Sequence, residues 1–130
     1  MSTNATISLV NDDKSVDQIY LHWDGYVEGA GKTLIENYTD AEKVRELIEL
    51  GNLSSLGAEI GEKHDFDKRP DNVCTAYRRD RGERGTSAQR FHTYSEWKRG
   101  RREQYNYLFD NGEWFVSKSN LRFHPLADKV

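Results

Sequence analysis

The segment His22-Trp23-Asp24-Gly25-Tyr26 brings an imidazole, an indole, a carboxylate and a phenol together within five residues. It falls where an expected strand ends and a glycine-rich loop begins, a position from which side chains often reach a ligand. Trp23 and Tyr26 could stack on a nucleobase or nicotinamide-like ring while His22 and Asp24 supply polar contacts. The alternative is that both aromatic side chains belong to the core and that Asp24 caps a turn.

The segment His64-Asp65-Phe66-Asp67 resembles half of a metal site. Carboxylate oxygens at alternate positions suit a hard cation, and an imidazole could join them. Basic residues flank these acids, so a salt-bridged loop is the favoured interpretation, and we expect no bound metal and no cofactor. His64, Asp65 and Asp67 are instead predicted to contact a ligand or partner.

An arginine-rich segment, 78–84, follows an expected strand at 73–78. Guanidinium groups bind phosphates and carboxylates in a bidentate manner, which predicts a site for an anion or an acidic partner. The predicted binding residues are Arg78, Arg79, Arg81 and Arg84. The alternative is that the embedded acids Asp80 and Glu83 hold the arginines in an internal lattice.

Two further patterns favour structural roles. Residues 25–33 look like a phosphate-binding loop, but five residues separate Gly25 from Gly31-Lys32-Thr33, where that motif has four. A glycine loop leading into a helix is the better interpretation. The single cysteine, Cys74, lies in a strand pattern and is expected to be a core residue rather than a nucleophile. No catalytic set can be assembled from the sequence.

The elements that must position these residues are typical of an α+β domain with a mostly antiparallel sheet. Alternating apolar residues predict a hairpin of strands 5–10 and 16–23. The pair Asn111-Gly112 predicts the tight turn of a second hairpin, between 104–109 and 113–117. A strand at 88–92 is expected to pair with 73–78.

Two helices are expected. A capping box beginning at Thr39 precedes apolar residues at helical spacing, which predicts the main helix at about 40–50. A second capping box beginning at Thr93 predicts a short helix from about 94 to 102.

The chain of 130 residues suits a single domain, 1–130, with ends 1–4 and 127–130 expected to be flexible. Aromatic residues make up 12% of it, which argues against disorder. We expect no membrane association, because no apolar run is long enough to span a bilayer and no signal-peptide core is present. A lone cysteine fits a reducing cytoplasm.

The net charge of −3 is the result of a cancellation. Residues 1–72 hold 15 acids and 7 bases, a balance of −8, whereas residues 73–130 hold 7 acids and 12 bases, a balance of +5. Arg99, Arg101 and Arg102 extend the basic stretch and could join an anion-binding face. Duplex DNA is not an expected partner, because the chain is acidic overall and lacks helix-turn-helix and zinc patterns.

Several segments together resemble a group of small accessory proteins encoded by tailed bacteriophages and prophages. The likeness covers about 16–117 and includes the His22-Trp23-Asp24-Gly25-Tyr26 motif and the Arg79-Asp80-Arg81-Gly82-Glu83 motif. In that group glycine often stands at the position of Arg78. The other matching segments are 34–38, 50–56, 61–67 and the hairpin from Tyr105 to Trp114. The resemblance implies a phage setting and the host bacterial cytoplasm.

The leading hypothesis is a non-enzymatic phage counter-defence protein that inhibits a bacterial immune system by stoichiometric binding. Its target would be a CRISPR or restriction complex, or a nucleotide immune signal that it sequesters. For a nucleotide, Trp23 and Tyr26 would stack on the base while Arg79 and Arg81 hold the phosphates. A homo-oligomer is left open.

Two alternatives stand beside this hypothesis. One is a small metal-dependent nuclease or nucleotide hydrolase, in which a cation would activate water. The residues converging on that cation would be His22, Asp24, His64, Asp65 and Asp67. The other alternative is a regulatory or interaction protein of the phage early region.

Overall fold

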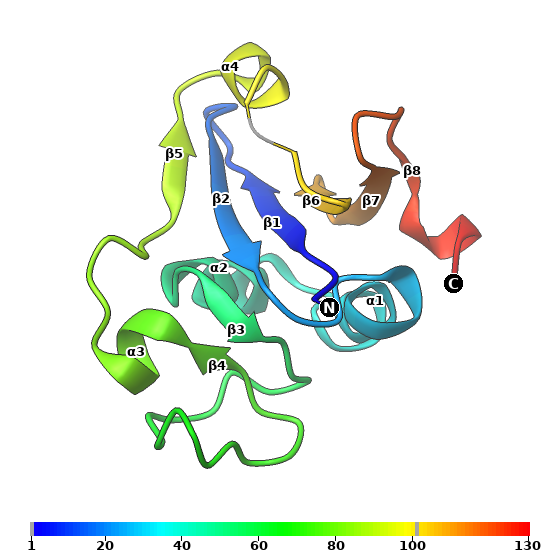
Figure 1. Ribbon diagram of the computed structural model, residues 1–130. Helices are drawn as coiled ribbons and strands as arrows, with labels where there is room; N and C mark the ends of the chain where they lie inside the picture. Colours follow the sequence, from blue (N-terminus) through cyan, green and yellow to red (C-terminus); the bar gives the residue numbers. More distant parts are fainter. Residues whose placement is uncertain (1, 101) are drawn as a thin grey trace.

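Figure 1 shows the computed structural model, which describes residues 2–100 and 102–130. Eight strands form one mixed sheet in the order β4-β3-β2-β1-β6-β7-β8, and β5 pairs with β2 outside this path. The strands are β1 (Ala5–Val10), β2 (Val16–Leu21), β3 (Leu53–Ser55), β4 (Thr75–Ala76), β5 (Gln89–Phe91), β6 (Tyr105–Asp110), β7 (Glu113–Lys118) and β8 (His124–Pro125). Among the pairings of these strands in the described residues, β1–β6 and β2–β3 are parallel and the others are antiparallel, which confirms the α+β class with a mostly antiparallel sheet.

Four α-helices, one π-helical turn and one 3₁₀ turn accompany the sheet within the described residues. They are a π-helical turn (Val27–Gly31), α1 (Lys32–Asn37), α2 (Ala41–Glu49), α3 (Tyr77–Arg81), α4 (Tyr94–Lys98) and a 3₁₀ turn (Leu126–Asp128). None of these helices is long and apolar enough to cross a membrane.

The main helix and both hairpins are where the sequence predicts them. The cap of α2 is Asp40 rather than Thr39, because the Asp40 carboxylate accepts a hydrogen bond from the Lys43 backbone N–H at 2.9 Å. The predicted cap of α4 is confirmed, since the Thr93 hydroxyl accepts from the Glu96 N–H at 3.1 Å. Asn111 and Gly112 adopt φ angles of 51° and 82°, as the tight turn between β6 and β7 requires.

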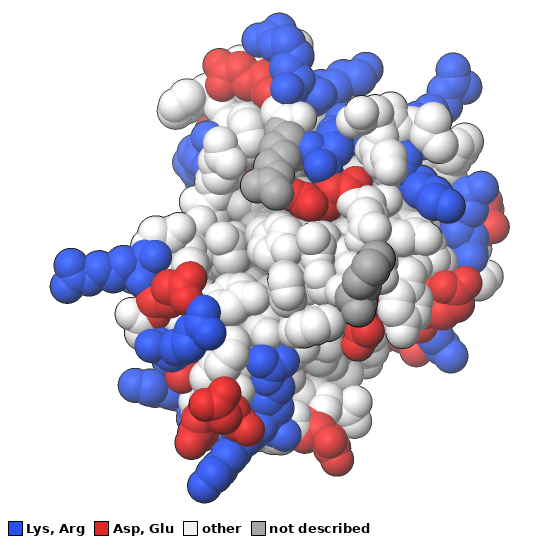
Figure 2. All heavy atoms as spheres, viewed as in Figure 1, with Lys and Arg blue, Asp and Glu red and all other residues white. Residues whose placement is uncertain are grey.

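One face of the central strands is apolar, and the other combines polar residues with a smaller apolar cluster of Val16, Trp97 and Leu108. Ile7 of β1 and Ile19 of β2 face a large core that includes Leu47 of α2, which lies behind the sheet in Figure 1. The neighbouring residues Thr6 and Ser8 point to the other side, as strand alternation requires. Figure 2 shows this opposite face, which is mostly uncharged over β1 and β2 and has charged side chains around its rim.

Helix α4 covers one end of the polar face. Trp97 is almost fully buried there, and its indole N–H lies 3.1 Å from the Ser8 hydroxyl and 2.9 Å from Gln18 Oε1. The helix ends at Lys98, and Gly100 N–H donates to the Trp97 carbonyl at 2.9 Å. The expected extension to residue 102 is therefore wrong.

The prediction of a strand at 73–78 paired with 88–92 is also wrong. Only Thr75–Ala76 is extended, and it pairs with β3, whereas β5 pairs with β2. The chain turns into α3 directly after β4, where the buried Asp80 carboxylate accepts a hydrogen bond from the Ala76 N–H at 2.8 Å. This bond satisfies a backbone donor at the start of the helix, which the alternating pattern could not reveal.

The chain ends are partly tied down. The Thr3 carbonyl accepts from Gly25 N–H at 2.8 Å, and the Asn4 N–H donates to the Gln104 side chain at 2.8 Å. Met1 lies outside the described residues. Near the other end, Leu126 is fully buried in the main core.

Cys74 is a core residue, as expected. It is fully buried, and the Tyr38 hydroxyl lies 3.4 Å from its sulfur. Burial raises the pKa of the Cys74 thiol above its usual range, which makes the reactive thiolate scarce at neutral pH.

We therefore expect Cys74 in the native protein to react with a disulfide reagent at least about 100-fold more slowly than an unfolded-chain thiol. The measurement is the rate of thiol modification with and without denaturant. A Cys74→Ala/Ser95→Cys variant, which moves the thiol to an exposed position, should react rapidly without denaturant. Rapid native reaction of Cys74 would contradict its burial.

Candidate functional site

The His22–Tyr26 segment continues β2 along β3 before it turns away. The backbone N–H groups of His22 and Trp23 donate to the carbonyls of Leu53 and Ser54, both at 3.0 Å. The Tyr20 hydroxyl lies 2.9 Å from His22 Nδ1. The His22 ring meets Trp23 edge-on, with 4.8 Å between ring centroids. His22 is therefore held between two aromatic side chains.

Trp23 and Tyr26 are not core residues. Their exposed fractions are 41% and 37%, so the alternative of two buried aromatics is wrong. Within residues 2–100 and 102–130, no ring contact joins the two side chains. They do not form a closed sandwich, although each offers a surface to a partner.

Asp24 and Gly25 have a structural part in this loop. Asp24 adopts a φ of 57°, and its carbonyl accepts from Ala30 N–H at 3.0 Å. The Gly25 carbonyl accepts from the buried Tyr107 hydroxyl at 2.7 Å. The residues that resemble a phosphate-binding loop form a π-helical turn joined directly to α1, so the expected glycine loop is itself helical.

His64 is fixed against α3 and β4. Its Nε2 lies 3.0 Å from the Thr75 hydroxyl, and its backbone N–H donates to Asp80 Oδ1 at 3.0 Å. Asp65 accepts from the Asp67 N–H at 3.0 Å, so its carboxylate closes a local turn. Among the residues that the structure describes, no three His, Cys, Asp or Glu side chains gather in a group able to hold a metal ion. The convergence required by the hydrolase alternative is absent from this part of the chain.

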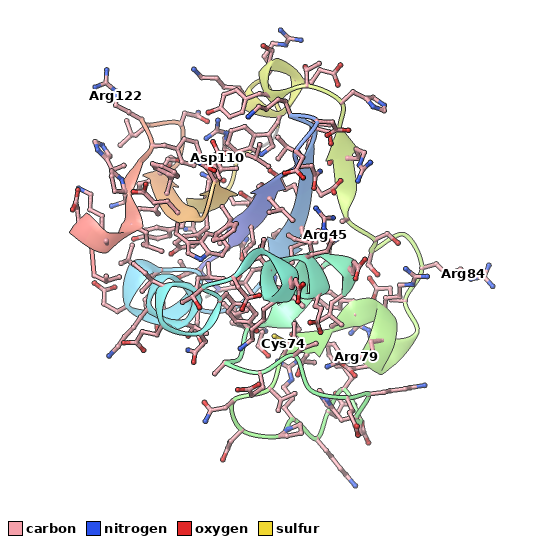
Figure 3. All side chains as sticks on the ribbon, turned by 180° about the vertical axis from the view of Figure 1, so that it is seen from behind. Arg45, Cys74, Arg79, Arg84, Asp110 and Arg122 are labelled. Carbon is pink, nitrogen blue, oxygen red and sulfur yellow. The ribbon has the colours of Figure 1, made fainter. Side chains whose placement is uncertain are left out.

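Arg79 belongs to the internal lattice rather than to an open anion site. Its Nε and Nη2 contact the two oxygens of Asp80 at 3.0 and 3.2 Å. Its remaining hydrogen bonds go to the carbonyls of Ile60, Gly61 and Cys74, at 2.9, 3.1 and 2.8 Å. A guanidinium has five N–H donors, and these five contacts match that number. Figure 3 shows Arg79 close to Cys74, turned toward the interior.

The other predicted arginines differ in their surroundings. The guanidinium of Arg81 lies over the rings of Phe66 and Tyr77, at 4.5 and 5.0 Å, and pairs with Glu83. Arg84 is exposed. Arg78 is also exposed, and its Nη1 lies 3.4 Å from the Ser87 hydroxyl. Arg79 and Arg81 are thus engaged by other parts of the protein, whereas Arg78 and Arg84 are exposed.

A cavity on the polar face of the sheet is the feature that the sequence reasoning missed. Its volume is about 400 Å³, and it lies between β1, β2 and the segment 85–89. Tyr20 lines it and connects it to His22 through the hydroxyl contact described above. The lining residues are Thr6, Gln18, Ile19, Tyr20, Asn52, Gly85, Ser87, Gln89 and Glu103. Thr6, Ser8 and Gln18 alternate with core residues along β1 and β2, which marks a polar side of the sheet but not a cavity.

The amide side chains of this cavity are oriented by hydrogen bonds to their oxygens. Gln18 Oε1 accepts from Trp97 and Ser8, at 2.9 and 3.1 Å. Asn52 Oδ1 accepts from the Tyr20 backbone N–H at 2.9 Å. With its oxygen engaged in this way, each of these two amides has an NH₂ group that can donate to a ligand. Gln89 lies directly opposite Gln18 in the β2–β5 pair and adds a third amide.

Comparison with known proteins gave no match to a protein-family model, to a curated protein or to a solved structure.

We expect Gly25→Ala to cost about 2 kcal/mol of unfolding free energy, because the added Cβ would lie 2.7 Å from Ala5 Cβ and 2.8 Å from the Thr3 carbonyl. Denaturant unfolding measures this. Gly112→Ala is the comparison, because a Cβ at Gly112 meets no neighbouring atom and only the φ of 82° disfavours it. This variant should lose about 1 kcal/mol of unfolding free energy. A smaller effect at Gly25 than at Gly112 would contradict the close packing of the loop.

Asp80 supports a second prediction. Burial alone would raise the pKa of its carboxyl group, but hydrogen bonds from Arg79 and from the backbone N–H groups of Ala76 and His64 outweigh burial and lower it. A lowered pKa in the folded state means that this carboxylate stabilises the protein at neutral pH. That stability is lost as the pH falls below about 4.

We expect Asp80→Asn to lower the unfolding free energy at pH 7 by about 3 kcal/mol, because it leaves the Arg79 charge without its partner. Between about pH 5 and pH 2, where such a carboxylate titrates, the stability of the variant should also fall less than that of the wild type. Chemical denaturation across pH measures both effects. Asp71→Asn, at an exposed position, serves as control and should change stability by less than about 0.5 kcal/mol.

Proposed function

We propose that this protein is a phage counter-defence factor that sequesters a nucleotide immune signal by stoichiometric binding, with the cavity on the polar sheet face as its site. The observation that carries the proposal is the set of oriented amide donors in a cavity of about 400 Å³. Nucleobases present several donors and acceptors at their edges, and hydrogen-bonding groups fixed in advance recognise them at low entropic cost.

The surroundings of the cavity fit such a ligand. His22 and the exposed Trp23 provide aromatic surface beyond Tyr20, and base–aromatic stacking is a general source of nucleotide affinity. Arg78 stands beside Ser87 at the cavity lining and offers a guanidinium for a phosphate. Arg78, rather than Arg79, would bind the phosphate, because Arg79 directs its donors to Asp80 and to backbone carbonyls.

We propose binding without turnover because the described residues that line the cavity carry hydroxyl and amide groups and one carboxylate, that of Glu103. Hydrolysis of a nucleotide generally needs an activated water or a nucleophile paired with a base. Amides and hydroxyls held by hydrogen bonds suit recognition of a ligand that is kept intact.

Isothermal titration calorimetry of the full chain against cyclic dinucleotides, cyclic oligoadenylates and ADP-ribose derivatives tests the proposal. We expect one of these ligands to bind with a dissociation constant of about 1 μM or lower. Asn52→Asp and Gln89→Ala should each weaken binding at least about tenfold, since each removes an amide donor. Asn52→Asp keeps the oxygen that accepts from Tyr20, so its fold should be preserved.

Glu49→Gln, an exposed change on α2, is the control and should bind like the wild type. The ligand should be recovered chemically unchanged when the complex is denatured. Absence of heat with every nucleotide, or capture of a CRISPR or restriction complex in its place, would refute sequestration. Conversion of the ligand would refute the non-enzymatic role.

A further inference from the structure

A second hollow, about 540 Å³ in volume, lies between α4 and the segment that joins β7 to β8. Four cationic side chains line it, and no carboxylate of the described residues is among its lining. They are Lys98, Arg99, Arg102 and Arg122. Figure 2 shows Lys and Arg side chains gathered at this end of the molecule. Like charges that share a hollow repel one another, and an anion between them would remove that repulsion.

Arg102 differs from the arginines that contact a carboxylate. Arg45, Arg79, Arg81 and Arg90 each pair with an acid. Arg102 instead lies over the rings of Trp97 and Phe123, at 4.8 and 4.7 Å from their centroids.

The charge of Arg102 has little compensation from the described part of the chain. Its Nε is buried and finds no hydrogen-bond partner there. Its Nη1 has only a long contact, 3.4 Å, to the Ser117 hydroxyl. Burial lowers the pKa of its guanidinium, as expected for a cation whose water has been displaced without replacement by an acid. An anion in the hollow would supply the missing opposite charge.

We propose that this hollow is a binding site for a compact, multiply charged phosphate group of the pyrophosphate type. Guanidinium groups bind phosphate oxygens through paired hydrogen bonds, and several cations around one hollow suit an anion with more than one charge. The exposed ring of Tyr94 and the ring of Phe123 line the same hollow. They provide an apolar wall for an organic group attached to the phosphate.

This site is separate from the cavity on the sheet face, and its evidence does not depend on the proposed function. Trp97 contacts one lining residue of each, because its N–H binds Gln18 and its ring contacts Arg102. The pyrophosphate site can be tested without any nucleotide.

The test is a titration of the full chain with inorganic pyrophosphate, in which binding is measured by calorimetry and by ³¹P line broadening. We expect a dissociation constant of about 1 mM or lower at low ionic strength, weakening as salt is added. The double variant Arg99→Gln/Arg122→Gln changes two exposed side chains of the hollow. It should weaken binding at least about tenfold.

The matched control is Lys32→Gln/Lys68→Gln, which removes the same amount of charge at exposed positions outside the hollow. It should bind pyrophosphate within about twofold of the wild type, because screened distant charges contribute little. Far-ultraviolet circular dichroism of both variants verifies that the fold is kept. Arg102→Lys, which retains the charge but loses the planar group, should give intermediate affinity.

Three outcomes would overturn the proposal. The first is no binding of pyrophosphate by the wild type, and the second is equal loss of binding in the hollow variant and the control. The third is binding of single-stranded oligonucleotide through Arg99 and Arg122 without any binding of pyrophosphate, which would assign the arginines to a nucleic-acid strand. A nucleotide that fails to bind the sheet-face cavity would leave the pyrophosphate result unaffected.

Discussion

The hydrogen bonds of Trp97 to Ser8 and Gln18 are the interaction on which the exposed face of the molecule depends. Strands β1 and β2 bury apolar residues on one face and polar residues on the other, and buried polar groups must find partners. On the apolar face, the Tyr107 hydroxyl and the Trp114 indole N–H donate to the carbonyls of Gly25 and Tyr38. On the polar face, the indole N–H docks α4 and fixes the Gln18 side chain at the same time. The amide donors of the cavity are therefore a consequence of how the fold satisfies its own sheet.

Arg79 and Arg102 show how little an arginine's place in the sequence says about its role. Arg79 lies in the motif that most suggests an anion site, yet its donors are used by Asp80 and by three backbone carbonyls. It thereby ties the segment 60–61 to α3. Arg102 belongs to a less conspicuous run, but within the described residues its guanidinium lies over two aromatic rings and pairs with no carboxylate. Uncompensated charge, rather than local density of arginine, identifies where an anion would be stabilised.

The sequence predicted those elements whose signals are local. Helix α2, the β6–β7 turn at Asn111-Gly112 and the burial of Cys74 follow from spacing, backbone conformation and pattern. The strand at 73–78 failed because the Asp80 carboxylate, four residues after Ala76, satisfies a backbone donor and starts a helix. The cavity was out of reach because Gln18, Asn52 and Gln89 come together only through the pairing of β2 with β5 and the docking of Asn52 beside Tyr20. Such long-range placement leaves no signal in a single sequence.

Trp97 also determines how the two hollows relate to each other. Its ring cannot move away from Arg102 without straining the bonds that hold Gln18, because one rigid indole makes both sets of contacts. An anion that shifted Arg102, and with it the Trp97 ring, would therefore change the orientation of the Gln18 amide in the sheet-face cavity. Thermodynamic linkage makes such coupling reciprocal, so a ligand that fixes Gln18 would equally favour one position of Arg102. Trp97 of α4 is therefore the residue through which the two proposed sites would be coupled.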